Sequence, residues 1–214
     1  MTHLRPRAIY AFGFLLLLIS HPVFSQSIID IDELQFVKGD QKAGVVLIEF
    51  ADYQCPFCAR FQRETFPRID KDYVLTGKVK FIFRNFPLEK SHPYAFKAAE
   101  AAICSGEQGK FWAIHTRLFD LQDTRSFNDW ASHARALALD SDRFMRCLED
   151  DVTASKVKKD VADGKSAGVK VTPTFLLGVT DSKTSSVKVI EKIEGAEDYS
   201  TFKKALDNLI AIPK

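Results

Sequence analysis

Residues 45–61 read VVLIEFADYQCPFCARF, and the fold can be worked out from this stretch. Val45 to Ala51 is an apolar run interrupted only by Glu49, which predicts a strand buried on both faces. Pro56 stands at the favoured first position of a helix, and the apolar residues after it follow helical spacing. The stretch therefore predicts a strand that leads into a helix, with Cys55-Pro56-Phe57-Cys58 at the junction.

Cys55 and Cys58 have the spacing of a reactive dithiol. A cysteine at a helix N-terminus lies beside unpaired backbone N–H groups and the positive end of the helix dipole. Both favour the thiolate and lower the pKa of the cysteine. Cys58 would lie one turn into the helix, close enough to form a disulfide with Cys55. Cys55 would then attack or be attacked, and Cys58 would resolve the mixed disulfide.

Two other uses of a CxxC pair are less compatible with this sequence. Zinc would need two further ligands, but Cys104 and Cys147 stand far apart and the histidines lack a ligand spacing. We therefore expect no metal. An inert bridge would close too small a ring to stabilise the fold much. The mature chain's histidines, His92, His115 and His133, fit solvated or capping positions better than catalytic ones.

The N-terminus indicates export. Arg5 and Arg7 precede the apolar run Ala8 to Ser20, and small or modest residues precede a cleavage point before Gln26. This pattern predicts a signal peptide over residues 1–25. The alternative is a retained membrane anchor, but the run is shorter than the roughly 20 residues that a spanning helix needs. Outside the cytosol, disulfides form and persist.

Composition excludes several classes of function. The chain has 214 residues, 46% of them hydrophobic, which is ordinary for a globular protein with a real core. Cleavage would remove two of the 30 basic residues and none of the 28 acidic ones, leaving 28 of each sign. This balance argues against a nucleic-acid partner. The sequence has no phosphate-binding glycine loop, so we expect no cofactor.

The remaining patterns predict the order of elements. Lys78 to Phe86 alternates like a strand, and a block of helices follows. The predicted helices of this block are 91–104, 107–121, 127–137, 141–149 with Ser141 as N-cap, and 153–166. Pro67 is expected to kink or end the earlier helix that begins at Pro56. Strands at 174–178 and 187–193 and a helix at 198–210 complete the chain. This order predicts one α/β domain over residues 26–214, with a helical insertion at about 91–166.

Three segments carry a resemblance to a known family. Glu49 to Cys58 (EFADYQCPFC) resembles the active-site segment of the DsbA-like branch of the thioredoxin superfamily, which are exported thiol–disulfide oxidoreductases. Gly168 to Phe175 (GVKVTPTF) resembles that family's cis-proline loop. Ala101 to Cys104 with Gln108 to Trp112 is similar to its helical-domain segment. The matches lie in order and cover most of the mature chain, which implies a thioredoxin fold with an inserted helical domain.

The resemblance implies roles for single residues. Cys55 matches the solvent-exposed nucleophile, Cys58 the buried resolving cysteine, and Pro173 the cis-proline that packs against the dithiol. The backbone of Thr172 would then face an extended substrate strand. Without the resemblance, Pro173 would be read as an edge-strand or turn proline.

Glu49 matches a buried acid of the family. If buried, it would have a raised pKa and could exchange a proton with Cys58. The alternative is an edge position from which its carboxylate reaches solvent. Phe57 replaces a histidine of the best-known members, which predicts a milder oxidant because the thiolate lacks that charge.

The resemblance also bears on the other cysteines and aromatics. It implies a structural disulfide between Cys104 and Cys147, with two buried free thiols as the alternative. Tyr53, Phe57 and Phe175 surround the dithiol in sequence. They could line an apolar substrate groove or belong to the core, and the sequence leaves both open.

The expected function is that of a monomeric periplasmic oxidoreductase. It would introduce disulfides into newly exported proteins that carry free thiols, and a DsbB-like membrane partner would reoxidise it. The alternatives are a reductase, an isomerase, and a non-catalytic, chaperone-like binder of unfolded chains. An isomerase of the dimeric type would need an N-terminal dimerisation domain, for which the roughly 19 residues Gln26 to Gly44 leave no room.

Overall fold

The structure is a computed structural model, and it describes residues 28–31, 36–122, 124, 126–181 and 186–212. The predicted signal peptide at 1–25 lies outside the described residues. None of the helices in the described ranges is long and apolar enough to cross a membrane.

A six-stranded mixed sheet forms the centre of the molecule, in the order β1-β6-β5-β3-β4-β2. The strands are β1 (Ile28–Asp30), β2 (Val37–Lys38), β3 (Val45–Ala51), β4 (Val79–Asn85), β5 (Thr174–Asp181) and β6 (Ser186–Glu194). β3 and β4 are parallel, and the other neighbouring strands are antiparallel. The expected βαβ start and ββα finish are therefore present, and the fold is thioredoxin-like.

Helices connect β3 to β4 and β4 to β5 along the chain, and one more follows β6. They are α1 (Pro56–Arg60), η1 (Phe61–Thr65), α2 (Phe66–Ile69), η2 (Asp70–Val74), α3 (Ala95–Gly106), α4 (Phe111–Asp120), α5 (Trp130–Ala136), α6 (Ser141–Leu148), α7 (Asp151–Ser166) and α8 (Tyr199–Ile210). The segments from α1 to η2 form one continuous helical stretch, in which η1 and η2 are π-helical. The insertion between β4 and β5 comprises α3 to α7.

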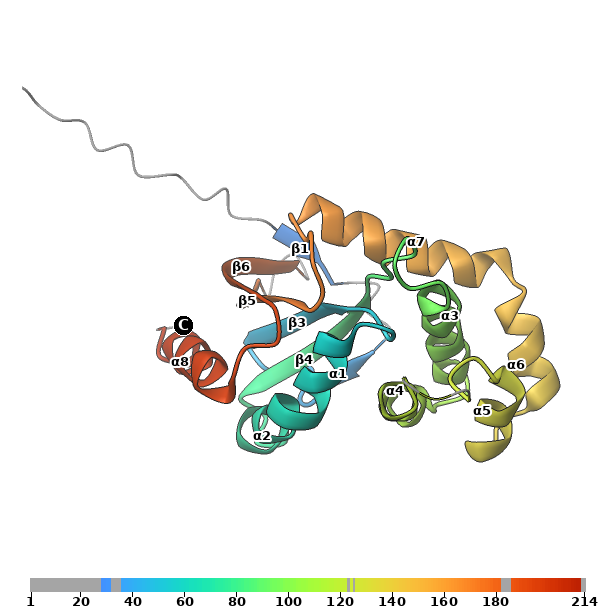
Figure 1. The fold of residues 1–214 in the computed structure, drawn as a ribbon. Coiled ribbons are helices and arrows are strands. Elements are labelled where there is room, and N and C mark those ends of the chain that lie inside the picture. Colours follow the sequence, from blue (N-terminus) through green and yellow to red (C-terminus); the bar gives the residue numbers. More distant parts are fainter. Residues whose placement is uncertain (1–27, 32–35, 123, 125, 182–185, 213–214) are drawn as a thin grey trace, which may run out of the picture.

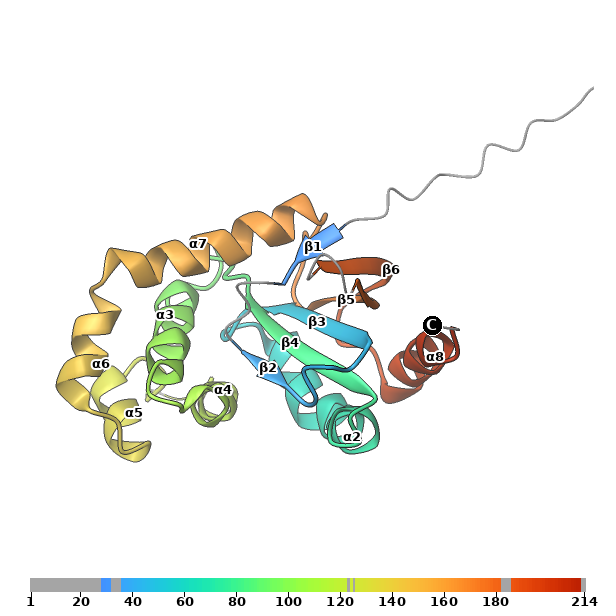
Figure 2. The ribbon, with the colours of Figure 1, turned by 180° about the vertical axis from the view of Figure 1, so that it is seen from behind.

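The sheet separates two apolar cores. On one face, α1, α2 and α8 pack against the side chains of Val45 and Leu47. On the other face, Val46, Ile48 and Phe50 pack toward α7, which crosses the sheet on the side opposite α8 (Figure 1). Viewed from behind, α3 to α6 stand beside the sheet at the end where α7 begins (Figure 2). The alternation along β3 therefore places Glu49 on the face of α1 and the dithiol.

The structure corrects three details of the sequence interpretation. Pro67 does not end the helix, which continues through it; the turn before it is π-helical, with Phe66 donating to Phe61 O. The N-cap of α6 is Asp140, whose carboxylate accepts from Arg143 N, because its charge suits the helix N-terminus. β3 is not the first strand, since β1 and β2 precede it and pair with β6 and β4.

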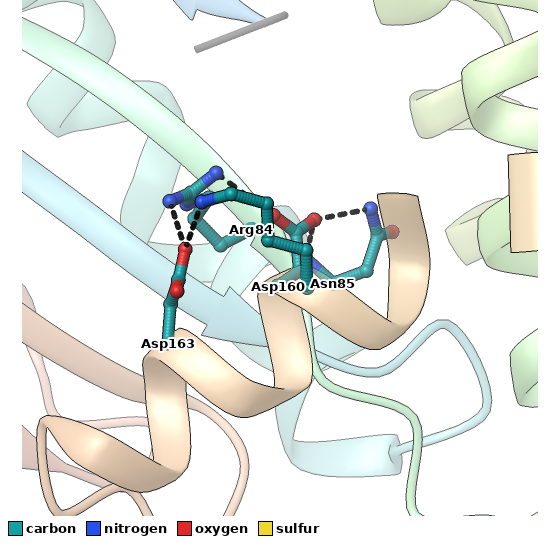
Figure 3. Close-up of polar contacts among 5 residues, drawn as sticks. Arg84, Asn85, Asp160 and Asp163 are labelled. Atoms are coloured by element: carbon teal, nitrogen blue, oxygen red, sulfur yellow. Dashed lines mark hydrogen bonds and ion pairs between the residues drawn. The ribbon is translucent and has the colours of Figure 1, made fainter. Parts of the chain in front are cut away.

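A buried polar cluster ties α7 to the end of β4 (Figure 3). The Arg84 guanidinium donates to Asp160 at 2.9 Å and to Asp163 at 2.8 Å. The other oxygen of Asp160 accepts from the backbone and side-chain N–H groups of Asn85 at 3.0 and 2.9 Å. This network fixes the helical insertion to the C-terminal end of β4, which lies beside the end of β3 that leads into the dithiol.

Candidate active site

The dithiol lies at the end of β3, where the chain turns into α1. Cys55 is the N-cap residue of α1 with an extended backbone, and Pro56 is the first helical residue. Both cysteines are free thiols in this structure. Cys58 is fully buried and Cys55 is only 4% exposed. The expectation of a solvent-exposed Cys55 is thus wrong for this state, because the chain around Thr172 lies against its sulfur.

The two cysteines differ in acidity. A hydrogen bond from Cys58, together with the backbone N–H groups of Cys58 and Phe57, lowers the pKa of Cys55 to about 6 against the opposing effect of burial. Burial raises the pKa of Cys58 well above its ordinary value, and the hydrogen bond with Cys55 adds to the rise. Cys55 is therefore the thiolate and Cys58 the thiol near neutral pH, as their positions at the helix start predict.

The loop before β5 packs against Cys55. The Thr172–Pro173 peptide bond is cis. When Cys55 is protonated, its thiol donates to the carbonyl oxygen of Thr172 at 3.3 Å, across 117 residues of sequence. The expected neighbours of the dithiol, Thr172 and Pro173, are thus brought to it by the tertiary fold.

Glu49 lies under the dithiol on β3 and is fully buried. Gln62 of η1 donates from Nε2 to Glu49 Oε2 at 2.7 Å. Glu49 Oε1 is buried and has no hydrogen-bond partner among the described residues. Burial raises the pKa of Glu49 well above its ordinary value; the bond from Gln62 lowers it and the charge on Cys55 raises it. The solvent-reaching alternative for Glu49 is therefore excluded.

Asp52 fixes the backbone just before the dithiol. Its carboxylate accepts from Gln54 N at 2.6 Å and from Leu88 N at 2.7 Å, and contacts His92 Nδ1 at 2.8 Å. Gln122, from the insertion, donates to the carbonyls of Tyr53 and Cys55 at 2.7 and 3.0 Å. The active-site turn is thus held from the β4–α3 loop and from the helical insertion.

Sequence reasoning missed Gln62, Asp52 and Gln122. Asp52 stands two residues before Gln54, an Asx-turn spacing that could have been recognised. Gln62 is four residues after Cys58, so helical periodicity places both on one helix face. No local signal in the sequence connects Gln122 to the dithiol, because its partners are more than 60 residues away.

The aromatic residues near the dithiol divide between surface and core. Phe57 is 54% exposed beside Cys55. Phe175 is fully buried between Phe61 and Phe202, with ring centroids 4.4 and 4.7 Å away, so it belongs to the core and cannot line a groove. Tyr53 is also buried, with its hydroxyl 3.1 Å from His115 Nδ1.

His115 and His133 are not the solvated or capping residues that the sequence suggested. His115 is buried, and this burial lowers its pKa to about 3, so its ring is neutral. His133 is buried as well and contacts Phe127 O at 2.8 Å. Of the three histidines that the structure describes, His92 is the partly exposed one, and it lies next to Asp52.

The second cysteine pair is remote from this chemistry. Cys104 of α3 and Cys147 of α6 form a disulfide that joins two helices of the insertion. Among the described residues, no group of three or more His, Cys, Asp or Glu side chains is placed to hold a metal ion.

A family model described as thioredoxin matches residues 32–208, which include the dithiol, the cis-proline loop and the whole insertion. The chain belongs to the thioredoxin family. Within the thioredoxin family it is of the DsbA-like type, because its fold carries the insertion α3 to α7 and matches a solved DsbA over most of both chains. The crystal structure of Wolbachia pipientis alpha-DsbA1 superposes with a TM-score of 0.74 at 27% identity, covering 85% of this chain and 93% of that one.

Curated relatives from two groups match this thioredoxin-family chain. A Na(+)/H(+) antiporter NhaA 3 of Salinispora tropica is 35% identical over 158 residues, which is 72% of this chain. The chain spans about a quarter (24%) of that relative's length. Disulfide bond formation protein D of Bacillus subtilis is 29% identical over 149 residues, 66% of each chain. The Cys55–Cys58 pair gives this chain the two thiols that thiol–disulfide exchange requires.

Proposed function

We propose that this protein is a thiol–disulfide oxidoreductase that donates disulfides to exported proteins that carry free thiols. The observation that supports this direction is the acidity difference between the two cysteines. A Cys55 pKa of about 6 stabilises the reduced form of the dithiol as a thiolate. A dithiol whose reduced form is stabilised is a better oxidant, because reduction of its disulfide becomes more favourable.

The exchange proceeds in two steps. A substrate thiolate attacks the sulfur of Cys55 in the disulfide form, the Cys55–Cys58 bond breaks, and Cys58 leaves with the electron pair. A second substrate thiolate then attacks the substrate sulfur of the mixed disulfide, and Cys55 leaves as a thiolate. Cys55 is the better leaving group of the two because its pKa is the lower one.

Glu49 supplies the proton for the first step. The thiolate that leaves from Cys58 is buried, and its raised pKa makes it a strong base. A neutral Glu49 transfers its proton to Cys58 and is reprotonated later through solvent.

Phe57, exposed beside Cys55, would contact the substrate, and the Thr172 backbone would face an extended substrate segment.

Export completes the proposal. A cleaved signal peptide over residues 1–25 would deliver residues 26–214 as a monomer to the periplasm, where disulfides persist. A membrane partner of the DsbB type would return the dithiol to the disulfide. The name of the Bacillus subtilis relative, a disulfide bond formation protein, agrees with this direction.

The decisive measurement is the reduction potential of the Cys55–Cys58 pair, equilibrated against glutathione. We expect a value between about −120 and −180 mV, the range from strong oxidants to isomerases. A potential near −270 mV, about that of thioredoxin, would make the protein a reductase and overturn the proposed direction. Cys55→Ser should abolish oxidation of a reduced, unfolded substrate, whereas a non-catalytic binder of unfolded chains would keep its function in this variant.

A further inference from the structure

Gln62 is the one polar partner of the buried Glu49 carboxyl among the described residues. It reaches Glu49 from the same helical stretch that carries the dithiol. Cys58 and Gln62 are four residues apart, so their side chains leave the same face of this stretch, one turn from each other. Gln62 is partly buried, and its amide ends inside the site.

The bond from Gln62 makes the two carboxyl oxygens of Glu49 unequal. Oε2 accepts from the amide at 2.7 Å, whereas Oε1 is buried without a partner. An oxygen that already accepts an N–H bond is the natural carbonyl end of a neutral carboxylic acid. The acid proton then belongs on the other oxygen.

We propose that Gln62 is the positioning residue of the proton relay: its amide holds Glu49 Oε2 as an acceptor and leaves Oε1 to carry the exchanged proton. The inference rests on the proposed role of Glu49 in dithiol exchange. When the Cys55–Cys58 bond breaks, the proton on Oε1 passes to the Cys58 sulfur and the negative charge remains on Glu49. The Gln62 amide stabilises that charge, because a hydrogen bond to an ionised acceptor is stronger than one to a neutral acceptor.

A neutral amide suits this task better than a cation would. A lysine or arginine at this position would hold Glu49 ionised and leave no proton to give, since an adjacent opposite charge favours the charged form. An apolar side chain would leave the carboxylate without any donor in the described part of the site, so proton release would become difficult. Gln62 lies between these extremes.

Two substitutions with opposite expected signs test this role. Gln62→Met keeps the length and removes the donor, so the titration midpoint of Glu49 should rise by about one pH unit or more. Gln62→Lys supplies a cationic donor, and the midpoint should fall by about one unit or more. The midpoint is read in the reduced full-length protein from the carboxyl carbon signal of labelled glutamate, assigned by its loss in Glu49→Gln. Glu64→Met, exposed in the same π-helical segment, is the matched control and should leave the midpoint unchanged.

The pH profile of substrate oxidation should move with the midpoint, upward for Gln62→Met and downward for Gln62→Lys. Equal midpoints in all variants, or shifts of the same sign in both, would overturn the positioning role. Because the midpoint is measured without substrate, this result is independent of the direction of exchange. A potential near that of thioredoxin would reject the proposed function and leave the Gln62 result standing.

Discussion

Glu49, beside the dithiol, and Asp160, on α7, are both buried carboxyl groups on opposite faces of the sheet, but their partners differ. Asp160 pairs with the Arg84 guanidinium and accepts two bonds from Asn85. Glu49 accepts one bond from a neutral amide, and no ion pair joins it to a cation among the described residues. Burial raises the pKa of both groups, but for Asp160 the charge of Arg84 and the bonds from Asn85 act against that rise.

This difference separates a structural carboxylate from a reactive one. A buried charge whose bonds are nearly all made stays ionised and fixes two elements to each other. A buried carboxyl with one free oxygen and no counter-ion has a pKa that can move, and such groups are typical of functional sites. The comparison predicts that changes in the Arg84 cluster alter stability and that changes at Glu49 alter chemistry.

The largest effect is expected from Arg84→Ala. It leaves Asp160 buried without its cation, and breaking a buried pair in this way costs about 3–5 kcal/mol. Urea unfolding should show this loss of free energy, while the exchange rate of the folded protein should remain at the parent level. A loss below about 1 kcal/mol, the value for an exposed pair, would contradict the structural assignment of this cluster.

Glu49→Gln should mainly slow the exchange chemistry, whereas Arg84→Ala should mainly lower the stability of the fold. Substrate oxidation should slow about tenfold, less than the ~10²–10⁴ of a direct acid–base catalyst, because water can partly replace the relay.

The difference in unfolding free energy between the parent and Glu49→Gln should also depend on pH. Since the pKa of Glu49 is raised above its unfolded value of about 4.3, the folded parent binds the extra proton and loses stability as pH rises through that window.

Urea unfolding of parent and variant at acid and neutral pH tests this sign. Glu49→Gln cannot titrate, so relative to the parent it should gain stability as pH rises from about 4 toward the folded pKa of Glu49. A difference that is independent of pH would show that Glu49 is not the buried, neutral acid that the comparison requires.

Phe57→His would sharpen the comparison by placing an imidazole beside Cys55, at a position where Phe57 carries no charge. An imidazolium beside Cys55 should lower its pKa from about 6 by roughly one unit. One unit corresponds to about 1.4 kcal/mol, or roughly 30 mV in a two-electron potential, so the variant should be the stronger oxidant by that amount. Thiolate absorbance and glutathione equilibration measure the two quantities. Ile190→His, exposed on β6, should change neither.

The smallest effect is expected from Asp163→Asn. Asp163 contacts the other guanidinium nitrogen of Arg84, but its side chain is 30% exposed, so water replaces part of the interaction. The loss of unfolding free energy should be about 1 kcal/mol or less. A loss as large as that of Arg84→Ala would show that the cluster acts as one unit rather than being centred on the buried Arg84–Asp160 pair.

The sequence by itself was sufficient for the local features of this protein. The apolar run over β3, Pro56 at the helix start and the CxxC spacing predicted the strand–helix junction, because each depends on neighbours in the chain. The same holds for β4, the helices of the insertion and the lowered pKa of Cys55, whose causes lie mainly within α1. The cis-proline loop was recognised as a motif, although its place beside Cys55 depends on the fold.

Only the tertiary structure decided the features that depend on contacts between distant parts of the chain. β1 and β2 are too short for a period-2 pattern, and they exist because β6 and β4 offer them partners. The burial of Phe175, the neutral state of His115 and the contact between Cys55 and Thr172 O depend on packing across the domain. The unequal oxygens of Glu49 depend on where η1 lies against β3. Burial and hydrogen-bond partners are properties of the packed molecule, and they set the acidity of the groups that the sequence could only name.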